Sequence, residues 1–114
     1  MINREIYMNK LLAYKNTEFI KVITGIRRCG KSSLLKLFME KLLEDNPNTN
    51  VIYMNFESFK FDNIVNYRDM YNEISKKIRP TERNYILLDE LQRIEEWEKA
   101  VNALKVDFDT DIYI

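Results

Sequence analysis

Glycine is nearly missing from this chain of 114 residues, and histidine is missing altogether. Without histidine, the chain can form neither a histidine-based zinc site nor a serine–histidine catalytic pair. The single cysteine excludes an internal disulfide and fits a reducing compartment. The only two glycines, Gly25 and Gly30, lie in one nine-residue stretch, GIRRCGKSS, so the backbone has a special task there.

An excess of one charge and long apolar runs are also missing. Lysine plus arginine and aspartate plus glutamate each number 18, which removes the simplest argument for a nucleic-acid or membrane-surface binder. No apolar run approaches the roughly 20 residues that a membrane span needs. The opening MINREIYMNK carries charges where a signal peptide would be apolar. We therefore expect a cytoplasmic protein, with no membrane partner and no indication of nucleic acid.

Strand and helix patterns alternate along the chain. Helical periodicity predicts helices over residues 3–14, 31–44, 64–78 and 95–105. Apolar, β-branched runs predict strands over 19–24, 51–56 and 85–88, and the opening of a fourth strand at 111–114. This order predicts the α/β class, a doubly wound parallel sheet flanked by helices. Ligands of such sheets bind at the carboxyl ends of the strands.

The glycine-containing stretch fits the phosphate-binding pattern Gly-x4-Gly-Lys-Ser between a predicted strand and a predicted helix. Successive N–H groups can wrap a phosphate there, at the positive end of the helix. Lys31 would place its charge on the β- and γ-phosphates of a nucleotide, and the Ser32 hydroxyl would ligate Mg²⁺. The alternative is a tight turn without a ligand. The residues expected to bind the nucleotide are Gly25, Ile26, Arg27, Arg28, Cys29, Gly30, Lys31, Ser32 and Ser33.

A second motif, YILLDE at residues 85–90, is an apolar strand that ends in two acids, the Walker B arrangement. Asp89 would hold Mg²⁺, mostly through its water ligands, which makes Ser32 and Asp89 the expected metal residues. Glu90 would orient and polarise an attacking water, so Glu90 and Lys31 are the expected catalytic residues. The alternative is a strand that simply runs out into solvent.

The stretches GIRRCGKSS, NFES (55–58) and YILLDELQRIEEWEKAVNAL (85–104) together resemble the AAA+-like P-loop ATPases of bacteria and archaea. The resemblance implies a P-loop NTPase sheet in which the fourth strand lies between the first and the third. It also implies ATP as ligand and Mg²⁺ as cofactor. Members of this family continue with a sensor segment, a fifth strand and a helical lid. Residues 1–114 are therefore expected to be the N-terminal part of one such domain.

Two functions stay open at this point. The chain is either an ATPase module, hydrolysing ATP in the complete protein, or a nucleotide-binding module or fragment without turnover. A guanine-nucleotide switch is less favoured, because the Asn-Lys-x-Asp pattern is absent. We further expect the first strand to leave an open sheet edge, with marginal stability and self-association of the chain through that edge. We expect little ATPase activity from these residues alone.

Overall fold

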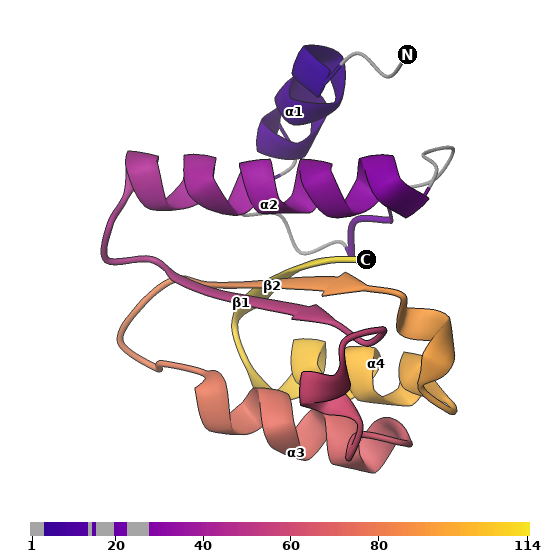
Figure 1. Cartoon of the computed structure of the whole chain (residues 1–114). Coiled ribbons are helices and arrows are strands. Elements are labelled where there is room, and N and C mark those ends of the chain that lie inside the picture. Colours follow the sequence, from indigo (N-terminus) through magenta and orange to yellow (C-terminus); the bar gives the residue numbers. More distant parts are fainter. Residues whose placement is uncertain (1–3, 14, 16–19, 23–27) are drawn as a thin grey trace.

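The computed structural model describes residues 4–13, 15, 20–22 and 28–114, which form an α/β fold (Figure 1). The helices and strands confirm the predicted alternation. In chain order they are α1 (Arg4–Ala13), α2 (Arg28–Asp45), β1 (Asn50–Asn55), α3 (Tyr67–Lys77), β2 (Asn84–Asp89), α4 (Trp97–Asp107) and β3 (Thr110–Tyr113). Two single-turn 3₁₀ helices, η1 (Phe59–Phe61) and η2 (Leu91–Arg93), follow β1 and β2.

The three strands form a parallel sheet in the order β1-β2-β3. Lys21 forms a parallel bridge with Tyr113, so the segment expected as the first strand lies beside β3. Its amide donates to the carbonyl of Ile112 (2.9 Å), and its carbonyl accepts from the amide of Ile114 (2.8 Å). The strand predicted as the fourth therefore lies between the first and the third, as the resemblance implies. Residues 19, 23 and 24 of the predicted first strand lie outside the described residues.

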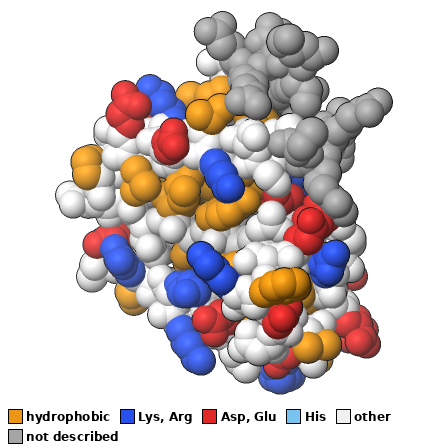
Figure 2. Space-filling model, in the orientation of Figure 1, with side chains coloured by type: hydrophobic (Ala, Val, Ile, Leu, Met, Phe, Trp, Pro, Cys, Tyr) orange, Lys and Arg blue, Asp and Glu red, His pale blue; other side chains and the backbone are white. Residues whose placement is uncertain are grey.

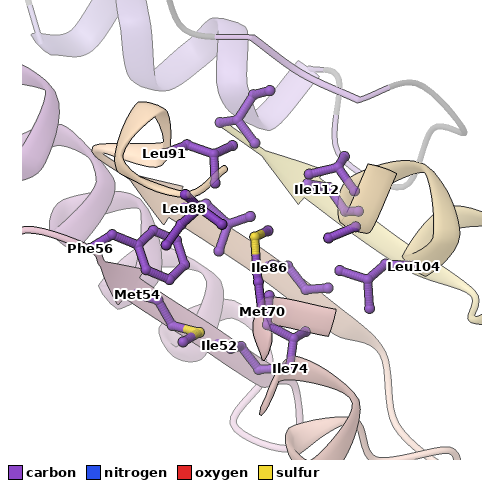
Figure 3. Close-up of a cluster of buried hydrophobic side chains, with 14 of the residues drawn as sticks. Ile52, Met54, Phe56, Met70, Ile74, Ile86, Leu88, Leu91, Leu104 and Ile112 are labelled. Carbon is purple, nitrogen blue, oxygen red and sulfur yellow. The ribbon is translucent and has the colours of Figure 1, made fainter. Parts of the chain in front are cut away.

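Helices cover both faces of the sheet, with α2 on one face and α3 and α4 on the other, and α1 packs against α2 on the side away from the sheet (Figure 1). Alternate residues of each strand face opposite ways. Ile52, Ile86 and Ile112 thus join the apolar cluster between the sheet and α3/α4, and Figure 3 labels these and several other members. The neighbouring Tyr85 and Tyr113 join a second cluster beneath α2. The predicted apolar stripe of α2 is confirmed by the burial of Leu34, Leu35, Phe38 and Leu42.

Three helix starts differ from the predictions. Helix α2 begins at Arg28 instead of residue 31, so six residues of the glycine-containing stretch, 28–33, are helical. Helix α3 begins at Tyr67, because the Asn66 side chain caps it by accepting from the amide of Asp69 (3.0 Å). Helix α4 begins at Trp97, because Glu96 has a left-handed backbone with φ of 54°. Local capping and backbone geometry decide these boundaries.

The surface carries acidic and basic side chains intermixed over the face shown in Figure 2, in keeping with the zero formal charge. None of the helices in the described part of the chain is long and apolar enough to cross a membrane. The expected cytoplasmic location stays a prediction.

Candidate nucleotide-binding site

Side chains from the first turns of α2 meet the carboxyl end of β2. The Ser32 hydroxyl donates a hydrogen bond to Oδ2 of Asp89. The Nζ atom of Lys31 lies 4.0 Å from Oδ1 of the same carboxylate. The Asp89 side chain is 1 % exposed and that of Lys31 is 19 % exposed. The fold thus brings together three of the expected site residues. Two of them, Ser32 and Asp89, are 57 positions apart in the sequence.

Asp89 is buried but well supplied with polar partners. Besides Lys31 and Ser32, the backbone amide of Glu90 donates to its Oδ1 atom at 3.0 Å. Its own carbonyl accepts from the amide of Phe56 at 3.1 Å, which ties the ends of β1 and β2 together. A buried carboxylate is tolerated only with such partners. The carboxylate is therefore held in place at the edge of the sheet where ligands of α/β proteins bind.

Glu90 follows β2 in a left-handed backbone conformation, with φ of 54° and ψ of 41°. This conformation is unfavourable for a residue with a Cβ atom, and such residues cluster at functional sites. The Glu90 residue is 8 % exposed, and its Oε1 atom accepts a hydrogen bond from Nε2 of Gln92 at 2.6 Å. The sharp turn after Asp89 therefore separates the two neighbouring acids, and Gln92 holds the second. Sequence reasoning gave Gln92 no role, although the DE-x-Q spacing was the available signal.

Two residues of β1 also reach this region and were missed from the sequence. Asn55 is the register partner of Asp89, and its Oδ1 atom accepts from the amide of Glu57 at 2.9 Å. Tyr53 lies two residues earlier on the same face. Burial, and then the negative charge of Asp89, raise the pKa of Tyr53, while Asn55 and Ser32 oppose the rise. The alternation of apolar and polar residues in IYMN was the signal that pairs Tyr53 with Asn55.

The phosphate-binding loop is described in part. Gly25, Ile26 and Arg27 lie outside the described residues, as do the side chains of Arg28 and Cys29. The backbone of residues 28–30 forms the first turn of α2, directly before Lys31 and Ser32. The first N–H groups of a helix have no partner within the helix and carry a partial positive charge. The start of α2 thus offers N–H donors and a lysine beside a hydroxyl and a carboxylate.

This donor set fits a nucleotide that carries Mg²⁺. Hydroxyl and carboxylate oxygens are the protein ligands that Mg²⁺ prefers, and the ion usually keeps several waters and binds substrate phosphates. In the described part of the chain, no group of three or more histidine, cysteine, aspartate or glutamate residues could hold a metal ion by itself. A site with one hydroxyl and one carboxylate therefore suits a metal that arrives with a phosphate ligand.

The parallel sheet flanked by helices, with the start of a helix meeting an acid at the end of a neighbouring strand, defines an α/β protein of the P-loop NTPase-like class. The AAA domain family matches residues 17–114, and the chain belongs to this family. The chain is accordingly an AAA-type module of a nucleotide-binding class.

Two curated relatives match the chain. An uncharacterised protein of Haemophilus influenzae is 44 % identical over 116 residues, covering 100 % of this chain and 29 % of the relative. An uncharacterised protein of Methanocaldococcus jannaschii is 36 % identical over 107 residues, covering 91 % of this chain and 21 % of the relative. The chain thus spans less than a third of the length of these relatives. No solved structure matches the chain.

Proposed function

We propose that the chain binds ATP together with Mg²⁺ at the site formed by the start of α2 and the end of β2. The observation that carries this proposal is the convergence of Lys31, Ser32 and Asp89. Sequence proximity places Lys31 and Ser32 together, but only the fold adds a buried carboxylate to them. The family gives independent support, since AAA domains are nucleotide-binding modules.

In this proposal each residue has a defined task. The N–H groups from Ile26 to Ser33 bind the phosphates, and Lys31 adds a positive charge on the β- and γ-phosphates. Ser32 holds Mg²⁺ directly, and Asp89 holds it mostly through water ligands. When bound, Mg²⁺ neutralises negative charge on the phosphates. The contacts that Lys31 and Ser32 now make with Asp89 keep these side chains near the positions that the ligand requires.

We further propose that the natural protein hydrolyses ATP, with Glu90 orienting and polarising the attacking water. Glu90 is buried at the carboxyl end of β2, next to Asp89, and Gln92 holds one of its oxygens. A fixed carboxylate can accept a proton from a bound water without first reorganising. The second candidate function is ATP binding without turnover. Because the relatives are much longer than this chain, turnover is a property to be measured on the whole protein.

Binding is tested by calorimetry with the Lys31→Ala variant. Charge-assisted contacts are each worth about 1.5–3 kcal/mol, so the dissociation constant for ATP should rise roughly 10- to 150-fold. Lys36→Ala, an exposed lysine of the same helix, is the matched control and should bind like the parent. Unchanged affinity of Lys31→Ala would overturn the assignment. Titration with GTP separates ATP binding from the guanine-nucleotide alternative.

Turnover is tested by phosphate release from the natural protein and from its Glu90→Gln variant. The amide keeps the size of the side chain but cannot accept the proton, so we expect ATP binding to stay and turnover to fall by about 10²- to 10⁴-fold. Glu98→Gln, an exposed acid on α4, serves as the control. Equal rates for Glu90→Gln and the parent would make Glu90 structural. Binding by a parent without turnover would select the second candidate.

We also propose that a second copy of the chain pairs with the sheet edge beyond residues 20–22. Val22 is 61 % exposed next to Lys21, the residue that bridges to β3. The neighbouring Phe19 and Ile23, which contributed to this expectation, lie outside the described residues. Exposed strand edges favour pairing with another chain. Sedimentation of the parent and of Val22→Lys tests this, and a monomeric parent at all concentrations would contradict it.

A further inference from the structure

Tyr53 carries a buried hydroxyl group that the proposed function has not used. Its oxygen is inaccessible to solvent and has no hydrogen-bond partner among the described residues. Its strand neighbours Ile52 and Met54 belong to the apolar cluster beneath α3 and α4, whereas Tyr53 packs on the α2 side. Buried polar atoms without partners are rare in native proteins, and each asks for an explanation such as a missing water or ion. Among the described residues, the other buried side-chain oxygen without a partner is Oγ1 of Thr110, at the start of β3.

The surroundings of this hydroxyl are the candidate metal ligands. Tyr53 is the register partner of Leu87, and Asn55 is the partner of Asp89, so Tyr53 lies one step along the strand from the carboxylate on the same face. Asp89 lies near enough to raise the pKa of Tyr53, after the larger effect of burial. The side chains of Asn55 and Ser32 lie near enough to lower it, although neither has the geometry of a hydrogen bond to the hydroxyl.

This hydroxyl can both donate and accept a hydrogen bond. A tyrosine phenol ordinarily has a pKa of about 10, so it keeps its proton at neutral pH. Nearby, Asp89 is a carboxylate whose oxygens already accept from Ser32 and from the amide of Glu90. A hydroxyl that lies near a carboxylate and a serine hydroxyl is well placed for a water molecule shared with them.

We propose that Tyr53 is a further binding residue of the metal–phosphate site, with its hydroxyl oxygen accepting a hydrogen bond from a water molecule that Mg²⁺ carries. This inference rests on the proposed function, because it requires Mg²⁺ at Ser32 and Asp89. Mg²⁺ sheds its waters reluctantly, and because waters on the ion donate hydrogen bonds, they need acceptors in the protein. Tyr53 supplies such a group from β1, a strand to which the phosphate-loop and Walker B patterns assign nothing.

The test is calorimetry of ATP binding, with Mg²⁺ and with a chelator, for the parent, Tyr53→Phe and Tyr85→Phe. Tyr85 is the matched control, because it is a buried tyrosine on the same sheet face that stacks near Arg83 at the start of β2. We expect the gain in ATP affinity on adding Mg²⁺ to be about 3- to 10-fold smaller in Tyr53→Phe than in the parent. Affinity without Mg²⁺ should be the same in both proteins, and Tyr85→Phe should keep the full gain.

Each outcome separates this inference from the proposed function. A parent whose ATP affinity does not depend on Mg²⁺ would overturn both. A parent that gains from Mg²⁺ while Tyr53→Phe gains equally would overturn the role of Tyr53 alone. So would an equal loss of affinity with and without Mg²⁺. Thermal unfolding without nucleotide gives a second measurement, since Tyr53→Phe removes a hydroxyl without a partner and should unfold no earlier than the parent. Earlier unfolding would show an internal partner for the hydroxyl and overturn the premise.

Discussion

The two faces of the sheet are built from the same strands but from different kinds of side chain. On the α3/α4 face, β2 contributes Ile86 and Leu88 to a continuous apolar cluster (Figure 3). On the α1/α2 face, the same strand contributes Tyr85 and Leu87 and then ends in Asp89, which contacts α2. Because successive residues of a strand face opposite ways, one strand can stabilise the fold with one set and position polar groups with the other.

The α1/α2 face also contains a buried ion pair, a second difference between the two faces. Lys21 and Asp111 form this pair, with side chains 8 % and 0 % exposed, and Arg83 approaches Asp111 to 3.9 Å. Lys21 also lies 5.3 Å from the ring centre of Tyr113. The α1/α2 face thus combines its own apolar cluster with buried polar contacts.

The largest expected effect comes from breaking the ion pair with Asp111→Asn. The change leaves the Lys21 ammonium buried without its carboxylate, which should lower the free energy of unfolding by about 3–5 kcal/mol. Urea denaturation followed by circular dichroism measures it. The double variant Lys21→Met/Asp111→Leu should recover most of the loss, because it removes both charges. A loss below about 1 kcal/mol in Asp111→Asn would show that Lys21 is solvated and that its ion pair contributes little to the stability of the α1/α2 face.

Leu88→Ala should disrupt the apolar face to a slightly smaller extent. Leu88 is 0 % exposed within the α3/α4 cluster, so truncation should lower the free energy of unfolding by about 2–5 kcal/mol. Val106→Ala, at a residue 84 % exposed, is the control and should stay within about 0.5 kcal/mol of the parent. Folded Leu88→Ala should keep the parent's ATP affinity. A loss of affinity that matches the loss of stability would show that the two faces are not independent.

Gln92→Ala tests whether the turn after β2 positions the Glu90 carboxylate. Removing the donor to Oε1 of Glu90 should lower kcat about fivefold and leave KM unchanged. The factor corresponds to the loss of one hydrogen bond with a net value of about 1 kcal/mol. Gln92→Glu, which replaces the donor by a second carboxylate, should lower kcat further. Phosphate release at several ATP concentrations separates kcat from KM. A rise in KM alone would assign Gln92 to binding.

The smallest effect concerns alkaline pH. Burial, and then Asp111 and Tyr85, raise the pKa of Tyr113 in the folded chain, while Arg83 lowers it. A raised pKa favours folding below the unfolded pKa of about 10, and this contribution is lost as pH rises above that value. Stability should therefore decline above about pH 10, and less steeply in Tyr113→Phe. Thermal unfolding between about pH 8 and about pH 11 measures the slopes. Equal slopes would place Tyr113 in contact with solvent.

Local patterns predicted most of the elements correctly. The apolar spacing of Leu34, Phe38 and Leu42 identified the buried side of α2, and all three are buried. The strand predictions differ from β1, β2 and β3 by one residue at each end. Helix starts were less accurate, because caps such as Asn66 and the left-handed Glu96 depend on backbone geometry that periodicity does not report. The roles of the site residues stay predictions.

The sequence by itself determined the class of the fold, the family and the identity of the candidate residues. Periodicity indicates which side of each element is apolar. The phosphate-binding pattern is formed by residues close together in the chain, Gly25, Gly30, Lys31 and Ser32, so it can be identified from the sequence. Only the tertiary structure decided that Ser32 meets Asp89 and that Lys21 meets Asp111. It alone placed the Tyr53 hydroxyl near Ser32 and Asp89, with no hydrogen-bond partner among the described residues. These contacts join residues far apart in the chain, so they arise from strand order and register, which no local pattern encodes.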